Sequence, residues 1–227
     1  MSTRLQSRNV DPRETETVGE EAGVFGVGHS DEKARQILDG ARTVFLRDGF
    51  DGASVADVAR AAGVSKGTLY AYWPSKEELF VAFIRHDKRQ QAERTCMWGE
   101  RPGETAAETL GRIGRTLIAM FARPEHVALV RTVMAVAPKF PSVGRAFYEA
   151  GPQYGAARLA GLLDRLVAAG ELDIADTHMA AVQFLNLCQS DFVRRLMFCV
   201  DDGNPRFETD AVVASAVHVF LAAYGRR

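Results

Sequence analysis

The sequence of 227 residues has few cysteines and no long apolar run. Its three cysteines, Cys96, Cys188 and Cys199, are odd in number and lie within apolar helical patterns, which predicts buried, reduced thiols rather than a disulfide framework. No stretch reaches the roughly 18 apolar residues that a membrane-spanning helix needs, and residues 1–30 lack the apolar core of a signal peptide. We therefore predict a cytoplasmic protein with no membrane partner.

Sequence signals of catalysis or metal binding are also missing. The five histidines include no pair at the helical spacing of metal ligands. The chain contains no H-E-x-x-H, no G-x-S-x-G and no glycine loop of the phosphate-binding type. We therefore predict that the protein is not an enzyme and has no metal and no cofactor.

An excess of positive charge is the third absence. With 28 basic and 29 acidic residues, the formal net charge is −1, which argues against a protein that coats nucleic acid without regard to sequence. A sequence-specific reader needs only a local basic face. The stretch between Ser65 and Lys76 has Lys66 and Lys76 but no acidic residue.

Residues 54–76 carry the most informative pattern in the chain. Gly63 separates two short apolar runs: a first helix with Val55, Val58, Ala59 and Ala62 at three- and four-residue spacing, and a second with Leu69 on its buried side. Ser54 and Ser65 are good N-caps for the two helices. The second helix would then turn Lys66, Gly67, Thr68, Tyr70, Ala71 and Tyr72 outward. The pattern predicts a helix-turn-helix whose second helix suits a DNA major groove.

The flanking segments extend this pattern. Residues 31–48 form an amphipathic helix that Gly49 ends, with Phe45 and Phe50 packing beneath Val55 and Leu69. After Pro74, Ser75 caps a further helix that reaches about residue 98. The free N–H groups of its first turn, together with Lys76, are suited to one DNA phosphate.

The stretch GVSKGTLYAYWPSKEEL, with the helix before it, resembles the TetR family of bacterial transcriptional regulators over about residues 31–83. The resemblance implies that Gly67 and Thr68 approach bases and that the tyrosines hold phosphates. The full implied DNA-binding set is Ser54, Ser65, Lys66, Gly67, Thr68, Tyr70, Tyr72 and Lys76. The alternative is that Tyr70 and Tyr72 only pack the small domain. Ala71 is smaller than the residues often found there, which puts base contact at that point in doubt.

The rest of the chain predicts an all-α body. Helical runs lie at about 104–122, 124–137, 141–149, 152–169, 175–199 and 207–224, separated by proline and glycine, and none has the period of two that marks a strand. The segment FPSVGRAFYEAGP and the later GEL resemble the AefR-like branch of the same family. This implies a ligand cavity, for which we select Trp98, Phe121, Met134, Phe147, Tyr154, Phe184 and Asn186. For any single one of them, an ordinary place in the helical core is the alternative that composition favours.

We expect a disordered extension over 1–30, a three-helix DNA-binding domain over 31–76, and a helical ligand-binding and dimerisation domain over 77–227. Rows of small and branched residues in the last two long helices favour a homodimer through a four-helix interface. The function expected is that of a sequence-specific repressor, released from its double-stranded DNA operator by a small, largely apolar effector. The alternative is a helical small-molecule binding protein with a vestigial DNA-binding head.

Overall fold

The structure is a computed structural model, and it describes residues 30–94, 99, 101–200 and 208–226. Over these ranges it is helical, without a strand and with one isolated antiparallel bridge between Leu172 and Gly225. Within them no helix is both long and apolar enough to cross a bilayer. Residues 1–29 of the extension expected over 1–30 lie outside the described residues, as do Cys96 and Trp98, whereas Ser30 is the N-cap of α1. The helices are α1 (Asp31–Gly52), α2 (Val55–Ala61), α3 (Lys66–Tyr72), α4 (Lys76–Arg94), α5 (Ala106–Phe121), α6 (Pro124–Val136), α7 (Pro141–Tyr148), the π-helical η1 (Glu149–Gln153), α8 (Tyr154–Ala168), α9 (Thr177–Gln189), α10 (Phe192–Met197) and α11 (Thr209–Tyr224).

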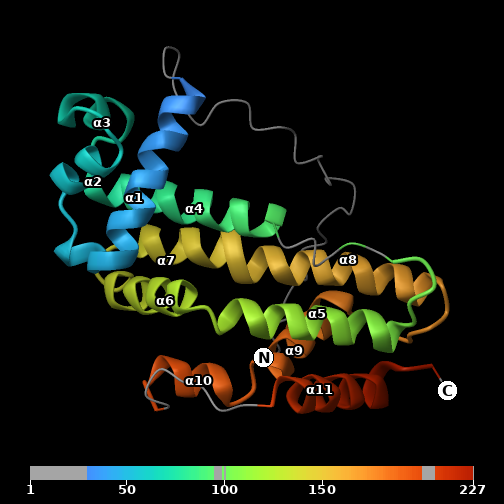
Figure 1. Cartoon of the computed structure of the whole chain (residues 1–227). Helices are drawn as coiled ribbons and strands as arrows, with labels where there is room; N and C mark the ends of the chain where they lie inside the picture. The colour runs from blue at the N-terminus through green and yellow to red at the C-terminus, as the bar shows by residue number, and fades with distance from the viewer. Residues whose placement is uncertain (1–29, 95–98, 100, 201–207, 227) are drawn as a thin grey trace, which may run out of the picture.

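Helices α1, α2 and α3 form a head at one end of the molecule, and α4 runs from it along the body (Figure 1). The predicted caps are present, since Ser54 Oγ accepts from Asp57 N at 3.1 Å and Ser75 Oγ accepts from Glu78 N at 3.1 Å. Gly49 takes a φ of 68° and kinks α1, after which a further turn continues to Gly52. That turn brings Phe50 back under the head.

The head shares its core with the body. Phe45 lies 4.7 Å from Phe80 between ring centroids, so α1 packs directly on α4. The same core continues into α6 and α7 through Val133 and Val143, both buried. The base of the head therefore packs against α4, α6 and α7 in one continuous core.

A second core holds the other end of the body together. It joins α5, α8, α9 and α11, with Phe184 and Phe220 in edge-to-face contact at 5.4 Å between centroids. Tyr224 Oη donates to Gln183 Oε1 at 2.5 Å and ties the end of α11 to α9. Cys188 is buried in this core, and burial raises the pKa of its thiol to about 12. Cys199 is exposed, so the prediction of buried thiols is wrong for it.

Two predicted helix boundaries were wrong. The break expected at Gly151 and Pro152 is absent, because the wide turn of η1 accommodates the proline, and α7, η1 and α8 form one rod (Figure 1). The single helix expected over 175–199 is broken at Ser190, which has a φ of 38°. The body therefore has one long rod over residues 141–168, and two separate helices, α9 and α10, where one was expected.

Candidate nucleic-acid interface and ligand cavity

Helix α3 is fixed at its start by a serine cap and held in place by one leucine. Ser65 Oγ accepts from Thr68 N at 3.0 Å and lies 2.9 Å from Thr68 Oγ1. Gly63 takes a φ of 63° in the turn before it, a conformation that favours glycine. Leu69 is fully buried. These contacts leave the opposite face of α3 on the surface.

The structure places most of the predicted DNA-binding set on that surface. Tyr70 is 47% exposed, so its ring does not belong to the core of the head. Thr68, Tyr72 and Lys76 are half-buried. The exposed members are Ser54, Ser65, Lys66, Gly67 and Tyr70.

Tyr72 links the end of α3 to the start of α1. Its hydroxyl accepts from the backbone N of Ser30 at 3.1 Å, and its ring lies 5.6 Å from that of Trp73. Ser30 is also the N-cap of α1, with its Oγ accepting from Lys33 N. The tyrosine hydroxyl is therefore held at the outer rim of the head rather than in its core.

Lys76 has an intramolecular role that the sequence pattern did not reveal. Its Nζ donates to the carbonyl oxygens of Phe50 at 2.8 Å and Ala53 at 3.1 Å. The same ammonium lies 4.5 Å from the centroid of the Phe50 ring. In this structure the side chain caps the end of α1, and it would have to leave these carbonyls to reach a phosphate.

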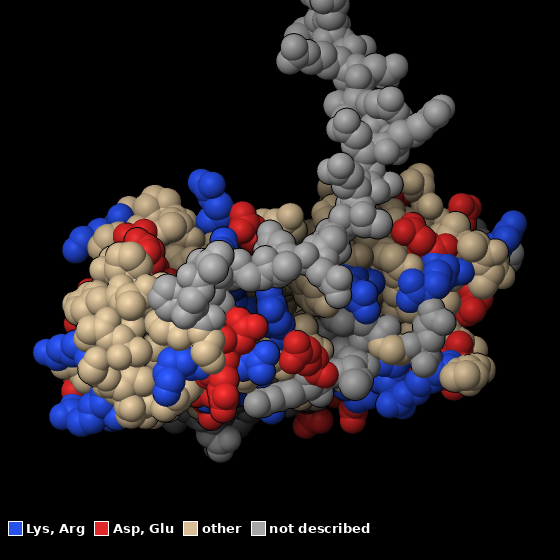
Figure 2. All heavy atoms as spheres, turned by 90° about the horizontal axis from the view of Figure 1, so that it is seen from above, with Lys and Arg blue, Asp and Glu red and all other residues tan. Residues whose placement is uncertain are grey.

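Charges of both signs are mixed on the face of the molecule that Figure 2 shows. Lysines and arginines lie among aspartates and glutamates over the visible head and body. Several basic residues of the head are paired, as in Arg47 with Asp48 at 2.6 Å. This pairing keeps the pKa of the Asp48 carboxyl below its usual value. The part of this face that the structure describes therefore carries mixed charge rather than one broad basic patch.

An apolar cavity of about 410 Å³ lies in the body between α4, α5, α6, α7, η1, α8, α9 and α10. Of the seven residues predicted for a ligand site, Phe121, Phe147, Tyr154 and Asn186 line it. Phe184 does not, because it is on the face of α9 that packs against α11 and is fully buried there. Met134 does not either, because it is on the outer side of α6 and is 62% exposed. Trp98 lies outside the described residues.

Lys88 and His126 also line this cavity, and the sequence analysis missed both. Lys88 is only 5% exposed, and burial lowers its pKa to about 8. Burial, together with the charge of Lys88, lowers the pKa of His126 to about 3. One sequence signal was available: Phe80, Ile84 and Lys88 follow one another at four-residue spacing on the buried face of α4.

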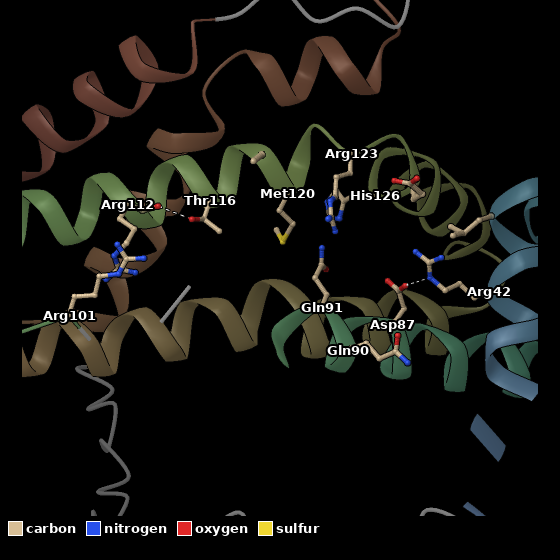
Figure 3. A pocket seen from close by; sticks show the side chains of 13 residues that line it. Arg42, Asp87, Gln90, Gln91, Arg101, Arg112, Thr116, Met120, Arg123 and His126 are labelled. Atoms are coloured by element: carbon tan, nitrogen blue, oxygen red, sulfur yellow. Dashed lines mark hydrogen bonds and ion pairs between the residues drawn. The ribbon is translucent and has the colours of Figure 1, made fainter. Parts of the chain in front are cut away.

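A more polar cavity of about 490 Å³ adjoins the apolar one and shares Gln91, Met120 and His126 with it. Figure 3 shows Gln91 from α4, with Arg123 and His126 from the start of α6, directed into it. Part of its lining is paired within the protein. Arg42 Nε lies 3.1 Å from Asp87, and Arg112 Nη2 lies 2.9 Å from Glu104. Glu104 has a lowered carboxyl pKa, chiefly through its hydrogen bond with Arg112.

Comparison with known sequence families gives two matches that follow each other along the chain. Residues 37–83 match the bacterial regulatory proteins of the tetR family, and residues 108–226 match the C-terminal domain of AefR-like transcriptional repressors. This chain belongs to the TetR family. The family assignment agrees with the helix-turn-helix in the head and the all-α body.

Relatives of this TetR-family chain are named as transcriptional regulators. It is 30% identical to an HTH-type transcriptional repressor of Mycobacterium tuberculosis over 132 residues, which cover 57% of this chain and 64% of that protein. It is 39% identical to the repressor AcnR of Corynebacterium efficiens over 59 residues, 26% of this chain and 31% of AcnR. The chain therefore matches less than two thirds of the length of both relatives.

Solved structures of similar fold cover more of this TetR-family chain. A TetR-family regulator from Mesorhizobium loti has a TM-score of 0.77 and 28% identity, covering 86% of this chain and 98% of its own. The flavonoid-responsive regulator FrrA has a TM-score of 0.73 and 32% identity, covering 87% of this chain and 100% of its own.

Proposed function

We propose that this protein is a homodimeric transcriptional repressor that binds a DNA operator through α3 and leaves it when a small, largely apolar effector occupies the body. The observation that carries the proposal is the outward face of α3. Lys66, Gly67 and Tyr70 are exposed there, while Leu69 anchors the helix from behind. Such a face presents donors to bases and phosphates at the start of a helix.

The dimer part of the proposal rests on α11. Residues 211–224 contain no Lys, Arg, Asp or Glu, and only Val213, Ala216 and Phe220 of this helix are buried within the chain. Val219 is 47% exposed on the remaining face. An uncharged helical face of small residues is suited to packing against its symmetry mate, with α9 completing a four-helix interface. A dimer would place two copies of α3 on two half-sites of a pseudo-palindromic operator.

The release part of the proposal rests on α4. Its first residue, Lys76, contacts the end of α1, while Lys88 and Gln91 reach the cavity at its other end. An effector that binds more tightly to one tilt of α4 would change the separation of the two heads. The shift in DNA binding is limited by the difference in effector affinity between the two states. The similar structure FrrA is named as a flavonoid-responsive regulator. This similarity supports an aromatic effector about the size of a flavonoid.

DNA binding can be tested by fluorescence anisotropy with the DNA upstream of the protein's own gene. We expect binding that survives excess non-specific competitor and weakens linearly in log–log salt with a slope of about −0.9 per phosphate contact. Lys66→Ala should lower the slope by roughly 0.9. Lys139→Ala, which removes the same charge from an exposed position between α6 and α7, should leave it unchanged. Binding that is abolished by competitor would contradict the proposal.

A further inference from the structure

Lys88 is buried in a largely apolar cavity, and the only acidic charge acting on it among the described residues is that of its neighbour Asp87, which raises its pKa less than burial lowers it. Its side chain reaches the cavity from α4 and is 5% exposed. Nζ lies 3.3 Å from Gln91 Oε1, 3.4 Å from His126 Nδ1 and 4.7 Å from the centroid of Phe147. An amide oxygen, a ring nitrogen and an aromatic face are weak partners for an ammonium compared with a carboxylate.

The acidic residues near Lys88 are engaged elsewhere. Asp87, its neighbour on α4, points to Arg42 at 3.1 Å. Glu149 on η1 lies 3.9 Å from Arg85. Among the described residues Lys88 has no salt-bridge partner of its own. A buried charge of this kind is costly unless an ion of opposite sign pairs with it.

The groups that share the cavity with Lys88 add no negative charge. The low pKa of His126 keeps its imidazole neutral at physiological pH, so that Nδ1 is free to accept from the ammonium. The other titratable side chains in the lining are His178, Tyr148 and Tyr154. No aspartate or glutamate is among the described residues of the lining. The ammonium of Lys88 is therefore the group with which an anion of a ligand would pair in this cavity.

We propose that the cavity binds a small molecule with an apolar body and one anionic oxygen group, a carboxylate or an ionised phenol, which pairs with Nζ of Lys88. This inference takes its cavity from the proposed function and adds the chemical class of the effector. The apolar body would lie against Leu117, Phe121 and Val130, which line the same cavity. A volume of about 410 Å³ has room for two or three fused or linked rings.

The position of Lys88 also connects the anion to the DNA-binding head. Lys88 is on α4, three turns from Lys76, whose Nζ contacts the end of α1. A charge pair formed at Lys88 would pull on α4 directly, whereas a purely apolar contact could be made with any wall of the cavity. Among ligands of equal affinity, those with an acidic group should therefore release DNA more effectively.

Two fluorescent probes of the same skeleton test the charge requirement. 8-Anilinonaphthalene-1-sulfonate carries one negative oxygen group, and N-phenyl-1-naphthylamine lacks it. In Lys88→Met we expect the dissociation constant of the sulfonate probe to rise about 10- to 100-fold, the usual effect of losing a charge-assisted hydrogen bond. The uncharged probe should change by less than about threefold. Lys139→Met removes a lysine that lies 5.2 Å from the Phe140 ring, outside the cavity, and should change neither constant.

A pH series on the unaltered protein gives an independent test, in which Lys88→Met serves only as the control. The sulfonate stays ionised throughout, while Lys88 loses its proton above a pH of about 8. The ratio of sulfonate to uncharged-probe affinity should therefore fall by up to about tenfold per pH unit above that point. In Lys88→Met, with folding checked by circular dichroism, the ratio should not change with pH.

The proposal would be overturned if both probes lost affinity equally in Lys88→Met. It would also be overturned if the ratio of the two probe affinities did not change with pH in the unaltered protein. Neither measurement involves DNA. Failure of the charge requirement is therefore separate from failure of operator binding, which the anisotropy measurement alone decides.

Discussion

Lys76 and Phe50 form the contact that joins the connecting helix to the head. Nζ of Lys76 donates to the Phe50 carbonyl at 2.8 Å and lies 4.5 Å from the centre of the same residue's ring. Phe50 in turn packs on Phe80 of α4 at 5.1 Å between centroids. A lysine expected to face a DNA phosphate thus closes the last turn of α1.

This contact predicts that Lys76 and Lys66 behave differently when mutated. Lys76→Met should lower the free energy of unfolding by about 1–2 kcal/mol, because two carbonyls lose their donor. Lys66→Met, at an exposed position, should change stability by less than about 0.5 kcal/mol while lowering the salt slope of DNA binding by roughly 0.9. Thermal unfolding and salt-dependent anisotropy measure the two effects. A drop in the salt slope of Lys76→Met with stability unchanged would instead favour the phosphate role.

Gly40 predicts a second effect on the head, at the crossing of α1 and α2. A Cβ at this position would lie 2.7 Å from both Cβ and N of Ala62. Gly40→Ala should therefore destabilise the protein by about 1–3 kcal/mol, even though alanine favours helix. Gly111→Ala is the matched control, because its Cβ would meet only the end of the Arg115 side chain at 3.6 Å. Chemical denaturation that showed the two variants to be equally stable would contradict this close crossing.

The low pKa of Lys88 predicts a gain in stability when the charge is removed. Between about pH 8 and the ordinary lysine pKa of 10.5, the unfolded chain binds more protons at this site than the folded protein, so the stability contributed by this group rises with pH. At pH 7 the buried ammonium therefore opposes folding. Lys88→Met should raise the free energy of unfolding at pH 7 by roughly 1–3 kcal/mol, and the gain should shrink above pH 8. A lower free energy of unfolding for Lys88→Met at pH 7 would contradict this and show that Lys88 stabilises the folded protein.

The exposed apolar face of α11 predicts that one charge disrupts the dimer. Val219→Glu would place a carboxylate in a symmetric interface, twice per dimer. Sedimentation velocity at micromolar concentration should give a monomer for this variant and a dimer for the unaltered protein. Met134→Glu, at an exposed site on α6, should remain dimeric. If Val219→Glu remained dimeric, the dimer interface would not include this face of α11.

Local patterns allowed the head to be predicted in detail, because its features depend on neighbours in sequence. Ser54, Ser65 and Ser75 cap the helices as expected, and Leu69 is buried as expected. The apolar pattern gave the outward residues of α3, and the resemblance to a family supplied their DNA-binding roles. The sequence pattern could not reveal the contact of Lys76 with Phe50, because the two residues are 26 positions apart. The kink at Gly49 brings them together.

The cavity was harder to predict, because apolar residues of a core and of a ligand site have the same composition. Phe184 and Asn186 are two residues apart on α9, yet only Asn186 faces the cavity. The packing of α9 against α11 decides this, and sequence spacing does not report it. Lys88 was missed because a lone lysine on a helix is usually exposed.

The central claim, that the outward face of α3 reads DNA as part of a dimer, is tested most directly by chemical footprinting of the upstream DNA. We expect two protected major-groove patches on one face of the duplex, separated by about one helical turn of 10 base pairs or a multiple of it. Thr68→Val, whose side chain has the same shape without the donor hydroxyl, should weaken both patches equally. A single patch, or protection that Thr68→Val and Lys66→Ala leave intact, would contradict the claim.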